Sequence, residues 1–296
     1  MRHTPLLFIP LFFVGCAQYA TVTSLKPSES PKTAHIKTLS VGTFEQDTLG
    51  LSQKVQASLS NLHPYFSIVS PRNNPEALVR GAITSKSVDL TPYNVERSEC
   101  IDRECHKRRT YRLTCITKSS SLNATVQIVD SRSHEILFAS NEYTSMEQNH
   151  CPDDSYTITS DEDHFALLSN QIAQNFANRL IPSSITYKIE LIDKSDIALT
   201  TLQKEQFETA LSEIENNRPD KALYGLQELS NSIKSYVLEY DLGVVYEMMG
   251  RLEEARIHYH NADIMIVQPN PLINNALSRI EQSIYDRNVV ASQIKQ

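Results

Sequence analysis

The stretch YRLTCITKSSSLNATVQIVDSRSHEILFASNEYTSM, residues 111–146, decides the fold of the first half of the chain. Apolar and β-branched residues recur on both sides of a short polar segment, SRSH at residues 131–134. Two such runs joined by a polar turn predict an antiparallel β-hairpin. We therefore expect one strand to end near residue 130 and the next to begin near residue 135.

Other periodic segments flank this hairpin. Further strands are predicted at residues 35–44, 65–71, 76–90 and 185–192. Residues 48–64 and 160–182 carry apolar residues at helical spacing, and Ser160 with Asp163 is typical of a helix N-cap. The resulting order, β-α-β-β-β-β-α-β, predicts an α+β domain, a mixed sheet with helices packed on it, over residues 35–193.

Three of these segments carry a family resemblance: LVRGAITSKSVD (residues 78–89), LNATVQIVDSRSHEILFAS (residues 122–140) and FANRLIP (residues 176–182). Together they resemble the superfamily of the curli-secretion lipoprotein (CsgG-like) and the TolB amino-terminal domain. The resemblance implies a periplasmic α/β domain. Other members of this superfamily include activators of peptidoglycan synthases and flagellar accessory proteins. The pore-forming member needs long amphipathic segments, whereas the corresponding segment here is short, basic and rich in cysteine, so we expect no transmembrane pore.

The second half is predicted to be all-helical. DLGVVYEMMGRLEEARIHYHNA (residues 241–262) resembles a tetratricopeptide repeat, and a weaker copy precedes it at residues 210–229. The residues at the family's spacing are Leu242, Gly243, Tyr246, Gly250, Ala255, Tyr259 and Ala262. The resemblance implies a repeat domain over residues 198–290 that binds envelope proteins in a groove.

The amino terminus, MRHTPLLFIPLFFVGCAQYA, predicts export. Its apolar run is too short to span a bilayer and has the size of a signal-peptide core. The sequence FVGC resembles a bacterial lipobox, which implies a signal peptide over residues 1–15 and lipid on Cys16; the alternative is an ordinary signal peptide with a chance cysteine. Lipoproteins kept at the inner membrane usually have Asp after this cysteine, so with Ala17 there the resemblance implies the outer membrane, facing the periplasm. Residues 16–34 are polar enough to be a flexible tether.

Export turns the remaining cysteines into candidates for disulfides, because the periplasm is oxidising. Four cysteines allow three pairings, and we favour Cys100–Cys105 with Cys115–Cys151. The first pair closes a short loop and the second ties strands on either side of a hairpin. A zinc site from Cys100, Cys105, His106 and Cys115 is the alternative, but the spacings lack paired C-x2-C motifs. We therefore predict no metal.

Charge and composition exclude some functions. The net charge of −7 argues against nucleic-acid binding, and with seven glycines there is no glycine-rich phosphate loop, so no cofactor is expected. The one basic stretch is predicted to be either a solvated loop or a contact for an acidic partner, a glycan or a lipid headgroup. Its members are Arg103, Lys107, Arg108, Arg109 and Arg112.

No catalytic arrangement stands out. Asp161, Glu162 and Asp163 are consecutive on the first turn of a helix, where capping explains them, and no G-x-S-x-G motif occurs. The sequence thus predicts a non-enzymatic envelope lipoprotein that acts as a scaffold or assembly factor for a secretion, pilus or flagellar machine. The alternatives are an activator of a peptidoglycan synthase, or a glycan- or ligand-binding module that uses the basic stretch.

Overall fold

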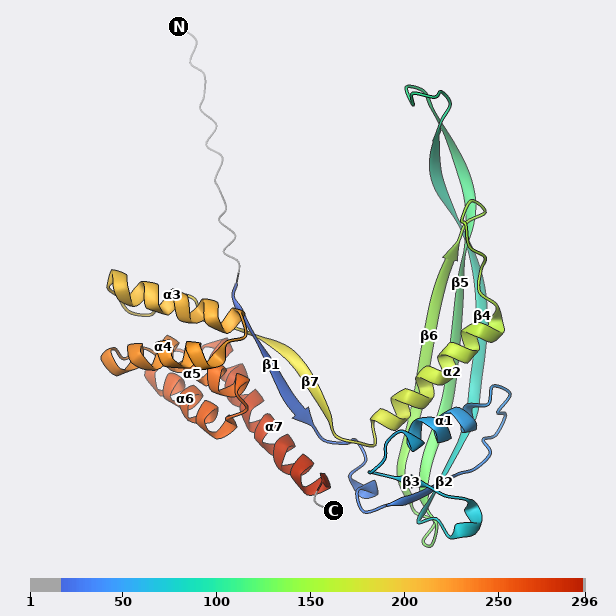
Figure 1. Ribbon diagram of the computed structural model, residues 1–296, viewed down its shortest axis with the longest axis horizontal. Helices are drawn as coiled ribbons and strands as arrows, with labels where there is room; N and C mark the ends of the chain where they lie inside the picture. Colours follow the sequence, from blue (N-terminus) through green and yellow to red (C-terminus); the bar gives the residue numbers. More distant parts are fainter. Residues whose placement is uncertain (1–16, 295–296) are drawn as a thin grey trace. The chain divides into compact units, whose positions relative to one another are not determined.

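The computed structural model describes residues 17–294, so the predicted signal peptide and the lipidation residue Cys16 lie outside the described residues. The chain divides into two compact units (Figure 1). One, here called the sheet unit, consists mainly of Pro27–Ser183. The other, the helical unit, combines residues 17–26 with Ser184–Ala291. No helix among the described residues combines the length and the apolar character that a membrane span requires.

The sheet unit contains a five-stranded sheet in the order β3-β2-β4-β5-β6. Its strands are β2 (Thr38–Val41), β3 (Ser67–Ile68), β4 (Ala77–Cys100), β5 (Arg108–Asp130) and β6 (Ile136–His150). β2 is parallel to both of its neighbours, whereas β4, β5 and β6 are antiparallel. This is the mixed sheet that the sequence predicted, and the turn between β5 and β6 falls at the expected residues.

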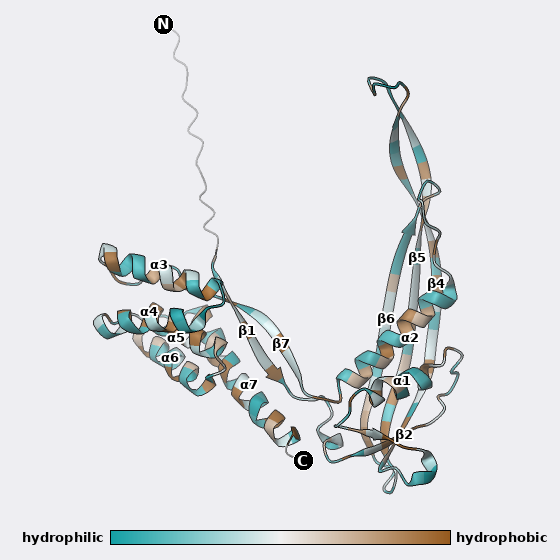
Figure 2. Cartoon of the chain, in the orientation of Figure 1, coloured by the Kyte–Doolittle hydropathy of each residue, from teal (hydrophilic) through white to brown (hydrophobic). Residues whose placement is uncertain are grey.

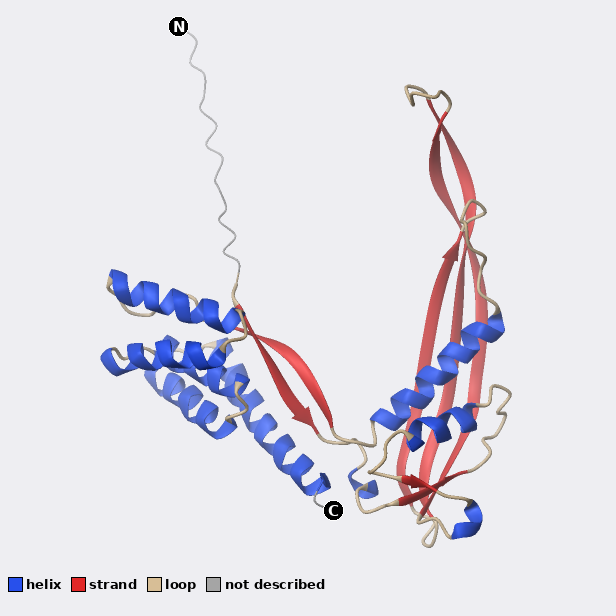
Figure 3. Ribbon diagram, viewed as in Figure 1, coloured by secondary structure: helices blue, strands red, loops and turns tan. Residues whose placement is uncertain are grey.

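Two helices, α1 (Leu51–Ser60) and α2 (Asp161–Asn178), cover one face of this sheet (Figure 3). Along β5 the even-numbered residues from Lys118 to Ile128 are buried beneath the helices, while the odd-numbered ones stay partly exposed. The core joins these residues to apolar side chains of α1 and α2. The Ser160 hydroxyl accepts a hydrogen bond from the Asp163 amide at 3.1 Å, as the predicted N-cap requires.

The helical unit begins with a strand that the sequence analysis missed. β1 (Tyr19–Lys26) pairs with β7 (Ser183–Glu190) in a two-stranded sheet. The prediction of a flexible tether over residues 16–34 is therefore wrong for β1, and β7 does not close the five-stranded sheet. The physical reason is burial: Ala20 and Val22 lie in the core of the helical unit, together with Ile189 of β7.

Five helices complete this unit (Figure 1). They are α3 (Thr201–Glu215), α4 (Pro219–Ser232), α5 (Tyr236–Met248), α6 (Leu252–Met265) and α7 (Pro271–Ile294). Consecutive helices pair, α3 with α4 and α5 with α6, and α4 also packs on α5. Gly250, with φ +70°, makes the turn between α5 and α6, in the left-handed region that glycine enters without strain. The predicted all-helical second half is thus a stack of paired helices.

Candidate interaction surfaces

The cysteine-bearing stretch is a β-ribbon rather than a loop. β5 pairs with β6 only from Ile116 to Val129, yet it pairs with β4 as far as Arg108, opposite Cys100. Residues 93–115 therefore form a two-stranded extension of the sheet, here called the ribbon (Figure 1). Only residues 101–107 are loop, whereas the sequence suggested that the whole cysteine-bearing stretch, residues 100–115, is a loop.

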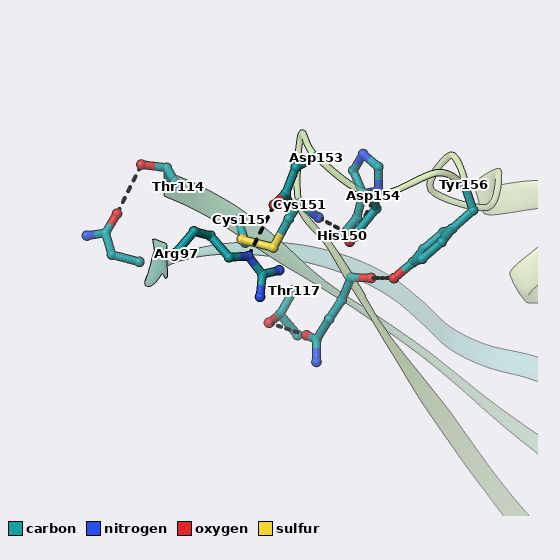
Figure 4. The surroundings of a disulfide bond; sticks show 11 residues. Arg97, Thr114, Cys115, Thr117, His150, Cys151, Asp153, Asp154 and Tyr156 are labelled. Atoms are coloured by element: carbon teal, nitrogen blue, oxygen red, sulfur yellow. Dashed lines mark hydrogen bonds and ion pairs between the residues drawn. A yellow bond between two sulfur atoms is a disulfide. The ribbon is translucent and has the colours of Figure 1, made fainter. Parts of the chain in front are cut away.

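One disulfide marks the base of the ribbon. β6 ends at His150, opposite Ile116, and the next residue, Cys151, is bonded to Cys115 across a Cα–Cα distance of 4.3 Å (Figure 4). The chain that leaves β6 is thereby fixed where three strands become two. Asp153 in that chain pairs with Arg97 of β4 at 3.1 Å, so both ribbon strands are anchored to it.

The following carboxylate supports the same corner. Asp154 accepts a hydrogen bond from the Cys151 amide at 2.6 Å, and this bond lowers the pKa of the carboxyl. The Sγ of Cys151 is part of the disulfide, and Asp153 is paired with Arg97. Cys151, Asp153 and Asp154 are therefore all engaged in bonds within the protein. We infer that these three residues stabilise the base of the ribbon.

A second disulfide, Cys100–Cys105, closes the tip of the ribbon. The loop inside it is held by the Lys107 amide, which donates to both Asp102 carboxylate oxygens at 3.2 Å. The pairing is the one favoured from the sequence. Because both tip sulfurs and that of Cys115 are in disulfides, no thiolate of the alternative zinc set is left to bind metal.

The two faces of the ribbon differ in chemistry. On one face Tyr93, Val95, Tyr111 and Leu113 lie side by side, each only partly buried. On the other, polar cross-strand pairs follow one another, including Asn94 with Thr114 (3.0 Å). Figure 2 shows hydrophobic and hydrophilic residues interleaved along these strands. The ribbon is thus amphipathic although no helix of the described residues covers it.

The predicted basic contact splits into two groups. Arg112 pairs with Glu96 at 3.5 Å and Arg109 pairs with Glu99, each with the residue directly opposite on the other strand. Within the described residues, no ion pair or hydrogen bond involves the side-chain nitrogens of the remaining members: Arg103, Lys107 and Arg108. These three lie in or next to the same tip loop as Ile101, which is 64% exposed. The free basic groups therefore gather at the tip.

The predicted repeat residues form the contact between α5 and α6. A Cβ on Gly243 would stand 2.6 Å from carbons of the Tyr259 ring, and this ring fills the space between the helices. Ala255, Ala262 and Leu242 are buried. Tyr246 stacks on His258 with ring centroids 5.0 Å apart. These residues therefore build the helix pair and are largely withdrawn from any partner.

Sequence reasoning missed a buried polar network beside them. The Glu247 carboxylate accepts hydrogen bonds from the hydroxyls of Tyr187 (2.8 Å) and Tyr259 (2.6 Å). The Arg279 guanidinium donates to both of its oxygens, at 2.9 and 3.1 Å. Burial, together with the Glu247 charge, raises the pKa of Tyr187 to about 12. The network ties β7, α5, α6 and α7 together, and no spacing rule links these four positions.

His164 and its neighbours also have a structural role. The buried ring places Nδ1 2.8 Å from the Ser120 hydroxyl, and burial with the nearby Lys118 charge lowers the pKa of His164. Lys118 donates to the Thr159 carbonyl and the Asp161 carboxylate, both at 2.6 Å. Asp161 in the first turn of α2 therefore binds the sheet, while the Asp163 carboxylate accepts a hydrogen bond from the Ser160 hydroxyl of the N-cap.

A groove runs between α3 and α4. Its volume is about 660 Å³, and its lining is mostly apolar. The two helices lie close together at the small residues Gly225 and Ala210, where a Cβ on the glycine would stand 3.5 Å from the Cβ of Ala210. The exposed side chains of Leu202 and Tyr224 also line the groove. Glu205 and Asp220 lie on its rim.

No protein-family model matches the chain, and no curated protein matches its sequence. Solved structures of bacterial lipoproteins are similar to part of it. A minor lipoprotein from Acinetobacter baumannii is 14% identical, with 49% of this chain and 90% of that chain covered and a TM-score of 0.27. Rare lipoprotein B from Shewanella oneidensis is 12% identical, with 49% and 90% covered and a TM-score of 0.25.

A third similar structure is the PelC dodecamer from Paraburkholderia phytofirmans. It is 7% identical, with 55% of this chain and 97% of that chain covered and a TM-score of 0.27. Likenesses at this level do not extend to function. The resemblances to the CsgG-like superfamily and to tetratricopeptide repeats stay predictions from the sequence.

Proposed function

We propose that the chain is a non-enzymatic lipoprotein of the bacterial cell envelope, which serves as a scaffold or assembly factor for other envelope proteins. Lipid on Cys16 would hold it at the outer membrane, facing the periplasm. The observation that carries the proposal is the ribbon: an amphipathic two-stranded extension with one disulfide at its base and one at its tip.

The ribbon's own energetics favour a docking role. Two strands alone are marginally stable in water because they cannot bury a face. Here the apolar residues Tyr93, Val95, Tyr111 and Leu113 lie on one face and stay partly exposed. A partner that covered this face would gain about 25 cal/mol for each Å² of apolar surface buried. Part of the ordering cost is met before binding, because β4 and β5 are already paired along the ribbon and the disulfides fix the chain at its base and tip.

The cysteine pairing also fits the proposed compartment. Disulfides persist in oxidising surroundings such as the periplasm and are rare in the cytosol. All four cysteines of the described residues are paired. The paired helices of the helical unit would offer a second docking surface of the tetratricopeptide type.

Crosslinking in living cells tests this function. A photoreactive amino acid at Tyr111 or Leu113 should form an adduct with one or a few envelope proteins, identified by mass spectrometry. The matched control is the same amino acid at His134, in the turn between β5 and β6 at the other end of the strand. If the ribbon positions yield no adducts beyond those of the control, the proposed function is wrong.

A further inference from the structure

The groove between α3 and α4 and the tip of the ribbon are complementary in chemistry. From α3 through α4, six acidic residues stand against three basic ones. The ribbon shows the reverse, with six Lys and Arg against four Asp and Glu. The two surfaces therefore carry opposite net charge.

The complementarity extends to individual groups. On the groove rim, the carboxylates of Glu205 and Asp220 have no hydrogen bond or ion pair to any residue that the structure describes. On the tip, the side chains of Arg103 and Arg108 are likewise unpaired within residues 17–294. Each surface thus has charged groups without an ion pair among the described residues, although Lys221 also lines the groove and Asp102 and Glu104 lie in the tip loop.

The apolar parts also match. Ile101 lies in the tip loop with 64% of its surface exposed, in the same short segment as Arg103 and Arg108. The groove offers an apolar lining with Leu202 and Tyr224, 65% and 72% exposed, above the small residues of its floor. A space of about 660 Å³ admits the isoleucine side chain together with the flanking guanidinium stems.

We propose that the ribbon tip of one copy docks in the α3–α4 groove of a second copy. Ile101 enters the apolar groove, while Arg103 and Arg108 pair with Glu205 and Asp220. The contact joins two different surfaces, so it is head-to-tail and builds a ring or an open chain of copies rather than a closed two-fold dimer. The inference rests on the proposed function, because it names a second copy as one partner of the ribbon.

The test uses mixed isotopes and the purified full-length protein in detergent. Unlabelled protein with a photoreactive amino acid at Ile101 is mixed with isotope-labelled wild-type protein and irradiated. The expected product is a crosslink from position 101 of the unlabelled chain to a labelled peptide from residues 201–232. Crosslinks confined to the same chain, crosslinks to labelled peptides elsewhere, or no crosslink would each overturn the proposal.

Charge reversal sharpens the result. Arg103→Glu with Arg108→Glu on the tip, or Glu205→Lys with Asp220→Lys on the groove, should each lower the yield about tenfold. Mixing the tip variant with the labelled groove variant should restore it, because the charges are complementary again; failure to restore it would contradict the pairing. Arg132→Glu and Glu281→Lys are single charge reversals at exposed sites outside residues 93–115 and 201–232. Each changes the charge by half as much as a double variant and should leave the yield unchanged.

The same experiment separates the two levels of the proposal. If purified copies do not crosslink to each other but ribbon positions still capture other envelope proteins in cells, the self-assembly is wrong and the docking function stands. If purified copies do not crosslink to each other and the ribbon positions capture no envelope protein, then the self-assembly and the docking function are both wrong.

Discussion

Gly243 of α5 faces the ring of Tyr259 of α6 so closely that a Cβ on the glycine would stand 2.6 Å from two ring carbons. The ring has no room to yield, because Tyr259 is fully buried and its hydroxyl is held by Glu247 at 2.6 Å. Gly243→Ala should therefore lower the free energy of unfolding of the helical unit by about 1–3 kcal/mol. Denaturant unfolding followed by the helical circular dichroism signal measures this change.

Gly225 supplies the matched control for that substitution. It also lies inside a helix, α4, but a Cβ there would stand 3.5 Å from the Cβ of Ala210, an ordinary contact. Gly225→Ala should be neutral or stabilising by up to about 1 kcal/mol, since alanine favours the helix more than glycine does. Equal losses in the two variants would show that the close approach of α5 and α6 is not what Gly243 provides.

The Cys115–Cys151 bond should contribute more to stability than the tip disulfide. It joins residues 36 apart in sequence. Closing a loop of this length lowers the conformational entropy of the unfolded chain and thereby stabilises the folded state by about 4 kcal/mol. Replacing both cysteines with alanine should lower the free energy of unfolding of the sheet unit by that order. Chemical denaturation under non-reducing conditions measures the loss.

The tip disulfide gives the comparison. Cys100 and Cys105 are five residues apart, so removing both should cost no more than about 2 kcal/mol. The ranking is the decisive part of this pair of measurements. A larger loss from the tip pair than from the base pair would contradict the chain-entropy account.

Asp241 should make the helical unit less stable as pH rises. The carboxyl is fully buried; its Oδ1 accepts from the Ile192 amide at 3.2 Å and its Oδ2 has no hydrogen-bond partner among the described residues. Burial raises the pKa of Asp241 well above 3.8, and the Asp193 charge adds to this. The folded state therefore keeps a proton that the unfolded chain releases, and stability falls with rising pH between the two pKa values.

The substitution that tests this is Asp241→Asn, which cannot ionise. Relative to wild type, its free energy of unfolding should increase as pH is raised from about 4 toward neutrality, by about 1.4 kcal/mol for each unit of raised pKa. Asp220→Asn, at an exposed site, should follow the wild-type profile. Parallel profiles for wild type and Asp241→Asn would mean that the buried carboxyl is not protonated in the folded state.

The sequence predicted the elements of the sheet unit because each carries its own local signal. The helix at α2 shows a cap at Ser160 and an apolar stripe, and the hairpin of β5 and β6 shows a polar turn. β1 has no such signal: only Ala20 and Val22 of its residues are buried. Its partner β7 lies about 160 residues later in the chain, so the pairing that orders β1 is invisible in any local window.

The ribbon was missed for a different reason. Its strands are exposed on both sides, so charged residues such as Glu99 and Arg109 interrupt the apolar pattern and suggest a loop. The charges nevertheless suit a strand, because opposite charges directly across a pair stabilise it. One signal was present: Tyr93 with Val95, and Tyr111 with Leu113, alternate with polar residues at the period of two that strands show.

Neither pattern nor composition could reveal the Glu247 network. Its members come from four elements, and each taken alone resembles an ordinary surface residue or a core tyrosine. What the structure adds is that the Glu247 side chain is fully buried and that every hydrogen bond it accepts is internal. The stability of the helix stack therefore depends on a charge pair that is removed from water.

Breaking this pair from one side should be costly. Glu247→Ala leaves the Arg279 guanidinium largely buried without its counter-charge, and such a loss typically costs about 3–5 kcal/mol. Removing Arg279 as well relieves that penalty, so the double variant Glu247→Ala with Arg279→Ala should lose about 1–3 kcal/mol less than the sum of the single variants. Glu208→Ala, which breaks an exposed pair with Lys204, should cost about 0.5 kcal/mol or less. Strict additivity in the denaturant-unfolding cycle would mean that Glu247 and Arg279 do not stabilise each other and that the network only fills space between the helices.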